Sequence, residues 1–440
     1  MNPKPHRESG VNAEASWPEK RLKFAVSLRK ARVDGALDDR PYIGLENVES
    51  WTGRLLLRAP HPDSDEVVSG ESLCNSFEPG DVLFGKLRPY LAKATVADFA
   101  GRCTTEFLVM QPADLTAKFL FYICVSRDFV TDVDTSTFGS RMPRADWANI
   151  GNLKIPIPTL EQQTAITDYL DAEVSKVDSL VTAKEQWLEL LAEKRQALIT
   201  HAVTRGINPS APLRDSGIPW LGQIPKHWRL VPLRFAVKFV SGATPDKGNA
   251  DFWVGTIPWV SPKDMKRDEI SDAEDHVSEE AILNSALRLV PVGSVLIVVR
   301  GMILAHSFPT AITTGPVTIN QDMKALICYE SLASRFLKAV FQGLSAWFVS
   351  SADQSAHGTK KLETETLGRF GIPLPPLDEQ NAIVAHIAEE TARLDALRVA
   401  TEASIVLLKE RRSALISAAV TGKLRVPAKS EVADSSATMV

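Results

Sequence analysis

A stretch of 50 residues that occurs twice constrains the fold of this chain more than any other feature. Residues 155–204 read IPIPTLEQQTAITDYLDAEVSKVDSLVTAKEQWLELLAEKRQALITHAVT, and residues 372–421 repeat the pattern 217 positions later without a gap. Of the 50 aligned positions, 22 carry the same residue. Shared helical composition alone does not produce that agreement, so the sequence predicts an internal duplication.

Each copy predicts one long helix. In the first copy, Thr159 and Gln162 have the spacing of a capping box, directly after a proline-rich extended segment. Gly206 is suited to a left-handed cap at the other end. We therefore expect helices over residues 159–206 and 376–425, and a helix of about 46 residues is roughly 70 Å long.

The apolar residues of both helices recur in heptads, which is the pattern of a coiled-coil seam. Because the two copies share this pattern, we expect each helix to be the other's antiparallel partner; the alternative is two unrelated helices that pack on their own domains. The predicted seam consists of Leu170, Val174, Val177, Val181, Leu188, Leu191 and Leu198 in the first helix, and Ile387, Leu394, Ile405, Leu408 and Leu415 in the second.

Two globular segments, residues 17–158 and 207–375, precede the helices. Their short apolar runs, punctuated by glycine and proline, predict strands, and residues 115–130 predict a helix. The fold class we expect is therefore α+β, with two mixed α/β heads, two long helices packed as an antiparallel coiled coil, and an approximate two-fold internal repeat. The polar ends, residues 1–16 and 426–440, are predicted to be disordered.

Composition argues against several classes of protein. The net charge of −4 is unlike that of a nucleic-acid coating protein, so any contact with DNA must come from local basic patches. The four cysteines are widely spaced, which favours buried thiols over a zinc site. The sequence begins without the apolar core of a signal peptide and has no membrane-spanning run, so we expect a cytoplasmic protein.

Several motifs resemble those of one family. The sequences IPIPTLEQQTAI and GIPLPPLDEQNAI open the two helices, WLGQIPKHW precedes the second head, and HGTKKL lies upstream of the second helix. Together with the duplicated plan, which covers about residues 17–425, they resemble the DNA-specificity subunit of type I restriction-modification enzymes.

The resemblance implies a division of labour between subunits. Each head would be a target recognition domain for one half of a bipartite, asymmetric duplex DNA site. The helices would be spacers and docking surfaces for two methyltransferase subunits, with restriction and translocase subunits where these are present. S-adenosylmethionine for adenine-N6 methylation, and ATP with Mg²⁺ for cleavage, would be bound by those partners. In agreement with this, the sequence contains no phosphate-binding loop, no zinc-protease motif and no amino-methyltransferase tetrad, so we expect no catalytic residue, metal or cofactor in this chain.

Basic and amide side chains in glycine-containing loops are the candidates for DNA contact, because arginine and lysine bind guanine and phosphate and asparagine can pair with adenine. Solvated loops and ordinary turn chemistry are the alternatives. The candidates are Lys86, Arg88, Arg141 and Arg144 in the first head, and Lys247, Asn249, Asn320, Gln321, His357, Thr359, Lys360 and Lys361 in the second.

Two other functions are compatible with the duplication. A coiled-coil adaptor that presents two protein-binding heads would have the same plan, but it would show no salt-sensitive affinity for duplex DNA. An enzyme with an unrecognised site in one head would show activity as an isolated chain.

Overall fold

The computed structural model describes residues 17–56, 73–139, 141–354 and 359–426. The chain forms two compact units. The first unit contains Met1–Glu185 and Glu402–Val440, and the second contains Gln186–Thr401. Each unit therefore consists of one head and a part of each long helix.

The first long helix, α5, spans Leu160–Arg205, within the range that the sequence predicts. Its start has the expected capping box, because the Thr159 amide donates to Gln162 Oε1 at 3.0 Å and the Gln162 amide donates to Thr159 Oγ1 at 3.3 Å. Its end has the expected cap, with Gly206 at φ +76°.

The second long helix, α10, spans Leu377–Val420 and ends earlier than the predicted residue 425. The reason is Gly422, which adopts a φ of +76° and turns the chain away from the helix axis. Most of the predicted C-terminal tail lies outside the described residues, as does the predicted N-terminal tail. The prediction of disorder is wrong for Val426, the one residue of the C-terminal tail that the structure describes, because it packs half-buried against the core of the first unit.

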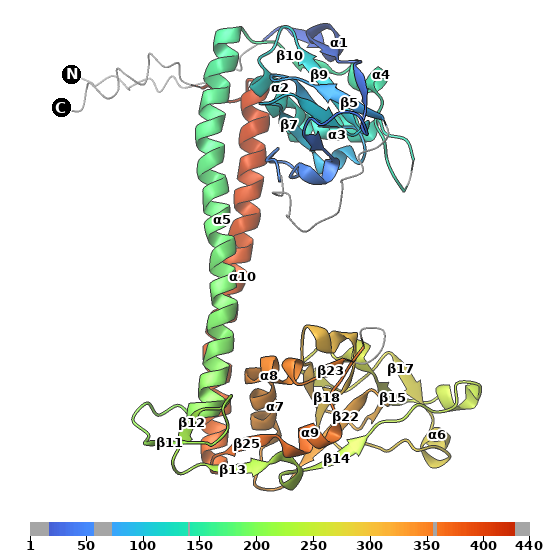
Figure 1. Ribbon diagram of the computed structural model, residues 1–440, viewed down its shortest axis with the longest axis vertical. Helices are drawn as coiled ribbons and strands as arrows, with labels where there is room; N and C mark the ends of the chain where they lie inside the picture. Colours follow the sequence, from blue (N-terminus) through green and yellow to red (C-terminus); the bar gives the residue numbers. More distant parts are fainter. Residues whose placement is uncertain (1–16, 57–72, 140, 355–358, 427–440) are drawn as a thin grey trace, which may run out of the picture. The chain divides into compact units, whose positions relative to one another are not determined.

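Within each unit the two helix segments run antiparallel. In the first unit, Arg412 contacts Asp178 and Lys409 contacts Glu185, so residue numbers decrease along α10 where they increase along α5 (Figure 1). In the second unit, Arg195 lies 4.0 Å from Asp395.

The predicted seam residues are buried or half-buried. The buried ones are Leu170, Val174, Val177, Val181, Leu191, Ile387, Leu394 and Ile405, and the half-buried ones are Leu188, Leu198, Leu408 and Leu415. Heptad periodicity therefore identified the faces on which the helices pack.

The head of the first unit contains two four-stranded sheets, in the orders β2-β9-β6-β7 and β3-β5-β8-β4. Its elements are β1 (Glu19–Arg21), α1 (Leu22–Ala25), β2 (Val26–Leu28), β3 (Arg32–Asp34), β4 (Tyr42–Ile43), η1 (Leu45–Asn47), β5 (Leu73–Phe77), β6 (Val82–Gly85), η2 (Pro89–Leu91), β7 (Ala94–Val96), β8 (Gly101–Cys103), β9 (Phe107–Pro112), α2 (Ala117–Cys124), α3 (Arg127–Thr135), α4 (Trp147–Ile150) and β10 (Lys154–Pro156).

The head of the second unit contains a five-stranded sheet in the order β14-β22-β18-β20-β16 and smaller sheets around it. Its strands are β11 (Leu213–Asp215), β12 (Gln223–Pro225), β13 (Arg229–Pro232), β14 (Val237–Ser241), β15 (Ile257–Val260), β16 (Glu269–Ile270), β17 (Asp275–Val277), β18 (Val295–Val298), β19 (Arg300–Gly301), β20 (Thr310–Thr313), β21 (Thr318–Ile319), β22 (Met323–Cys328), β23 (Asp353–Gln354), β24 (Lys360–Lys361) and β25 (Gly371–Leu374). Its helices are η3 (Leu233–Phe235), η4 (Ala250–Trp253), η5 (Pro262–Asp264), α6 (Glu279–Leu283), η6 (Met302–Ala305), α7 (Ser334–Gly343), α8 (Ser345–Ser350) and α9 (Thr364–Arg369).

The two heads share one topology. The order β2-β9-β6-β7 of the first head corresponds to β14-β22-β18-β20 of the second, with antiparallel pairing throughout. The parallel pair of β4 and β8 corresponds to that of β15 and β21. The duplication therefore includes the heads, although their sequences have diverged more than those of the helices.

One buried glutamine attaches each helix start to its head in the same way. Gln163 is fully buried; its Nε2 donates to the carbonyls of Asp114 and Pro158, and its Oε1 accepts from the Thr116 amide at 2.7 Å. Gln380, 217 residues later, is also fully buried and makes the same three bonds.

In this second copy, Gln380 Nε2 donates to Ser331 and Pro375, and its Oε1 accepts from the Ala333 amide at 2.8 Å. Thr116 and Ala333 are the N-cap residues of α2 and α7. Each glutamine therefore satisfies backbone groups at the point where the head meets the long helix.

The helix predicted over residues 115–130 is wrong in one respect, because the structure divides it into α2 and α3. Ser126 is the N-cap residue of α3 in extended conformation, and its hydroxyl donates to the Ile123 carbonyl, so the chain turns there. The cysteines agree with the expectation of thiols inside the protein: three are buried and Cys328 is half-buried.

Candidate nucleic-acid interface

In the first head, the segment that follows β6 lies beside the loop that precedes α4. The Arg88 amide donates to the Pro143 carbonyl at 2.8 Å, and the Ala145 amide donates to the Lys86 carbonyl at 2.9 Å. A bridge pairs Leu87 with Arg144. Two loops that are distant in sequence thus bring the predicted residues Lys86, Arg88 and Arg144 together.

The charges of this cluster, which we call the first basic cluster (Lys86, Arg88, Arg141 and Arg144), are partly compensated. Arg144 Nη2 lies 2.8 Å from Glu106 Oε1, whereas the other carboxylate oxygen, Oε2, is buried without a hydrogen-bond partner among the described residues. Arg88 and Arg141 are exposed and form no ion pair in the described part of the chain. These two side chains are therefore available to an anion in solution.

In the second head, β24 lies between β19 and β23, and this pairing places Arg300 opposite Lys361. Thr359 and Lys360 are half-buried, and Lys360 Nζ donates to the Val349 carbonyl at 3.4 Å. Lys361 Nζ pairs with Glu363 at 2.7 Å. His357, the remaining candidate of this loop, lies outside the described residues.

The position of Arg300 is equivalent to the segment after β6 in the first head. Its strand follows β18, which has the place of β6 in the sheet, and the Leu362 amide donates to the Val299 carbonyl as the Ala145 amide donates to that of Lys86. Arg300 is exposed. It was not among the predicted candidates, although the similarity of GSVLIVVRG to GDVLFGKLR places it next to the position that corresponds to Arg88.

Lys324 also belongs to this region and was missed. Burial lowers the pKa of Lys324, a neighbouring Lys361 lowers it further, and Glu363 opposes the shift. Its Nζ donates to Ser241 Oγ at 2.9 Å. It was not predicted as a candidate because it lies on strand β22, where no glycine or proline marks a loop. We call Arg300, Lys324, Lys360 and Lys361 the second basic cluster.

The amide candidates of the second head have local roles. Asn320 is only 6% exposed and its Oδ1 accepts from the Asp322 amide at 3.1 Å, so this side chain completes a local turn and its contact with DNA stays a prediction. Asn249 caps η4 by accepting from the Asp251 amide at 3.1 Å, which is the turn role that the sequence left open.

Two further candidates are at the surface near these turns. Gln321 is exposed and hydrogen bonds to the Thr244 hydroxyl, and Lys247 is exposed in the loop before η4. The Asp322 carbonyl, next to Gln321, accepts from the Arg300 amide at 3.2 Å. Gln321 therefore borders the second basic cluster.

Among the described residues, no group of three or more histidine, cysteine, aspartate or glutamate side chains is arranged to hold a metal ion. Within the same residues, no helix has the length and apolar character needed to cross a membrane.

Comparison with known proteins identifies the family. The model of the type I restriction modification DNA specificity domain matches residues 68–190 and 225–396, one segment for each repeat and more than half of the chain together. The specificity subunit of the Escherichia coli enzyme EcoR124I/EcoR124II is 37% identical over 148 residues, which are 33% of this chain and 37% of that protein. The MjaIX specificity subunit of Methanocaldococcus jannaschii is 29% identical over 166 residues, 37% of this chain and 38% of that protein. The matches thus span little more than a third of these relatives.

Solved structures have the same fold. A chain from a study of complex assembly and conformational transition of the type I R-M system aligns with a TM-score of 0.73 at 21% identity, over 94% of this chain and all of that chain. The HsdS subunit of Thermoanaerobacter tengcongensis aligns with a TM-score of 0.55 at 21% identity, over 95% of this chain and all of that chain. With two matched domains and two heads of one topology, this chain belongs to the family of type I restriction-modification DNA specificity proteins.

Proposed function

We propose that this chain is a non-catalytic subunit that reads a bipartite, asymmetric site in duplex DNA, one half-site with each head, and directs partner subunits to it in the cytoplasm. The observation that carries the proposal is the repeated placement of basic side chains after the equivalent strands β6 and β18. Because the surrounding residues differ between the heads, the two half-sites differ as well.

In the first head, Arg88 and Arg141 are the proposed base-reading residues, since both are exposed and free of ion pairs in the described part of the chain. An arginine guanidinium can donate two hydrogen bonds to one guanine. Lys86 and Arg144 are proposed to bind phosphate, because they are half-buried or already paired and have less freedom to enter a groove.

In the second head, Arg300 is the proposed groove-facing residue, and Lys361 on the adjacent strand, which is already paired with Glu363, is proposed to bind phosphate. Lys324 and Lys360 contribute positive charge behind them, and a phosphate there would restore the pKa of Lys324 toward its ordinary value. Gln321 and Thr359 are proposed as supporting polar contacts at its border. Lys247, and His357 outside the described residues, are proposed as further contacts of this head on the ground of the sequence alone. Asn249 and Asn320 are left out because their side chains are used in turns.

The proposed partners are two methyltransferase subunits that act on adenine N6, together with restriction subunits where these are present. Duplicated exposed leucines on the helices support two copies of one partner: Leu180 is 52% exposed and its counterpart Leu397 is 49% exposed, while Leu190 and Leu407 are 55% and 64% exposed. An apolar side chain that the repeat leaves in water twice suits a protein surface that binds twice. S-adenosylmethionine, ATP and Mg²⁺ would be bound by these partners.

The test is methylome sequencing of cells that carry this chain and its methyltransferase partner, followed by binding of the purified complex to the duplex that the methylome defines. We expect a two-part motif with a non-specific spacer. Arg88→Ala should reduce discrimination at one half-site, and Arg300→Ala should reduce it at the other, each by about 1–3 kcal/mol per lost bidentate contact.

Lys154→Ala is the matched control for the first head, because this lysine is exposed on β10, which pairs with β1, and is not a member of the first basic cluster. It should leave both half-sites unchanged. Binding that is insensitive to salt, or a chain that binds only proteins, would favour the adaptor alternative and refute the proposal.

A further inference from the structure

A buried arginine connects the helices of the first unit with the head. Arg412, on α10, has a side chain that is only 9% exposed. Its Nε donates to Asp178 Oδ1 on α5 at 2.8 Å, and its Nη1 donates to the carbonyl of Trp51 in the head at 2.9 Å. One guanidinium thus ties three segments of the chain together.

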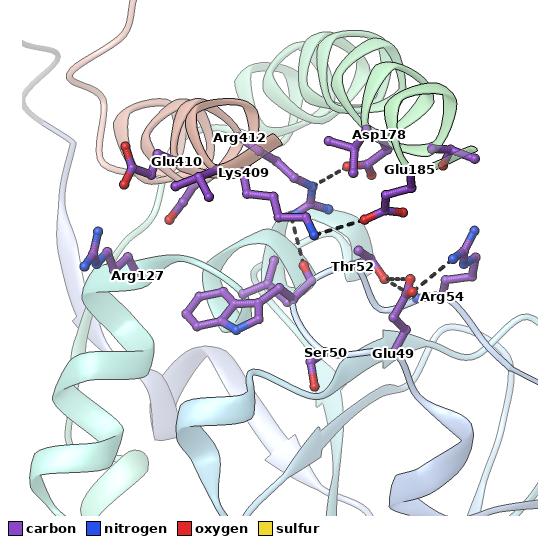
Figure 2. A pocket seen from close by; sticks show the side chains of 16 residues that line it. Glu49, Ser50, Thr52, Arg54, Arg127, Asp178, Glu185, Lys409, Glu410 and Arg412 are labelled. Atoms are coloured by element: carbon purple, nitrogen blue, oxygen red, sulfur yellow. Dashed lines mark hydrogen bonds and ion pairs between the residues drawn. The ribbon is translucent and has the colours of Figure 1, made fainter. Parts of the chain in front are cut away.

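These residues border a cavity of about 680 Å³ between the head and the helix pair. Figure 2 shows the Arg412 and Lys409 side chains extending from α10 toward Asp178 and Glu185 of α5. Beside this cavity, Arg412 provides a polar contact that joins both helices to the head.

Trp51, whose carbonyl accepts the hydrogen bond from Arg412, has a strained backbone conformation. Among the described residues, only three that are not glycine have a positive φ: Trp51 at +67°, Arg88 at +50° and Ala92 at +46°. For such residues this conformation is unfavourable and persists only where the surroundings impose it.

All three strained residues lie on one hydrogen-bonded path. The Trp51 amide donates to the Ala92 carbonyl at 3.2 Å, and the Ala92 amide donates to the Pro89 carbonyl at 2.8 Å. Arg88 precedes this turn as the N-cap residue of η2, and its carbonyl accepts from the Leu91 amide at 3.0 Å. The path therefore runs from Arg412 to the backbone of the proposed base-reading residue.

In the described part of the second repeat, the equivalent arginine is not buried. The counterparts of Arg412 and Asp178, 217 residues away, are Arg195 and Asp395; they are 4.0 Å apart, with side chains 42% and 48% exposed. In the second head, Gly301 follows Arg300 and has a positive φ without a side-chain penalty.

We propose that Arg412 is a positioning residue for DNA recognition by the first head only: through Trp51 and Ala92 it fixes the turn that presents Arg88. This inference rests on the proposed function, since it concerns how one half-site is read. It predicts that recognition by the first head depends on the helices, and that recognition by the second head does not depend on the equivalent arginine.

The experiment uses the complex of the full chain with its methyltransferase partner. The half-site of the first head is identified as the one that changes when residues 17–158 are replaced by the corresponding head of another family member. Discrimination is then measured as the ratio of Kd values for duplexes with an intact and a scrambled half-site. The variants are Arg412→Met, Arg412→Lys and, as matched control, Arg195→Met.

Arg412→Met should reduce discrimination at the first half-site by roughly two- to thirtyfold and leave the second unchanged. Arg412→Lys keeps a cation beside Asp178 but lacks the planar group that reaches two acceptors at once, so it should show the same selective loss with a smaller change in Tm. Arg195→Met should change neither half-site.

The outcomes separate the two proposals. If the wild-type complex recognises no bipartite site, the proposed function fails. If the wild type reads both half-sites and Arg412→Met lowers Tm without changing discrimination, or weakens both half-sites equally, Arg412 is a structural residue and the inference is refuted.

Discussion

Replacement of Gln163 by methionine should weaken the first unit selectively. Gln163→Met keeps the volume and apolar stem of the side chain but removes its three hydrogen bonds, to Thr116, Asp114 and Pro158. A buried polar group without a partner costs about 1–3 kcal/mol. Because the Thr116 amide and the Asp114 carbonyl are partly reached by solvent, we expect a total of about 2–4 kcal/mol rather than three full penalties.

The assay is hydrogen exchange of the full chain, read by mass spectrometry for α2, because a chain with two units does not unfold in one transition. Gln380→Met is the matched control: it removes the same bonds in the second unit and should expose α7 instead. A loss of less than about 1 kcal/mol in α2, or equal losses in both units after either change, would show that these glutamines do not fix the helix starts to their heads.

Three further changes test other contacts. Tyr122→Phe should destabilise the first unit by about 1.5–3 kcal/mol, because it removes the hydrogen bond that the phenol donates to Asp171 at 2.7 Å. Burial and this hydrogen bond both raise the pKa of Tyr122 and hold it protonated. The control is Tyr329→Phe at an exposed tyrosine, and equal melting temperatures of the two variants would contradict the assignment. Gly53→Ala should lower stability in thermal unfolding by about 2–4 kcal/mol, because Gly53 has a φ of +71° and a Cβ there would lie 2.4 Å from Phe121. Gly217→Ala is the control and should lower stability by about 1–2 kcal/mol, because Gly217 has a φ of +74° but open space around it. A smaller loss at Gly53 than at Gly217 would refute the packing argument. Hydrogen bonds from Arg40 lower the pKa of Asp38 to about 2, so the stabilisation by this carboxylate is present above its unfolded pKa and is lost as pH falls through about 2. The titration of the Asp38 carboxyl, followed by NMR, should show that midpoint, and Arg40→Ala should move the midpoint back toward 3.8. An unchanged midpoint would exclude Arg40 as the cause.

The long helices were predictable because their determinants are local. A capping box at Thr159, a glycine at 206 and a heptad seam each lie within a few residues of the feature that they specify. The sheets were not predictable in this way. Strand β2 pairs with β9, which joins Val26 to Pro112, and nothing near either residue indicates its partner.

The candidate contacts divide along the same line. Lys86, Arg88 and Arg144 were predicted as candidates because glycine and proline mark their loops, and the structure brings these loops together. Arg300 and Lys324 were not predicted as candidates because they lie in paired strands, where a basic residue has no loop signal. The sequence leaves two roles open for Asn320, because an asparagine that can pair with adenine can equally complete a turn, and the structure shows the turn.

The division of the chain into units has a consequence for the order of synthesis. The second unit is continuous in sequence, whereas the first combines Met1–Glu185 with Glu402–Val440. Its core includes Ile416, Ala419 and Val420, from the last helix to be made. The head that emerges first from the ribosome is therefore completed last, and until then its seam on α5 remains uncovered. A chain cut short after Thr401 would keep every segment of the second unit and leave the first without its apolar partner.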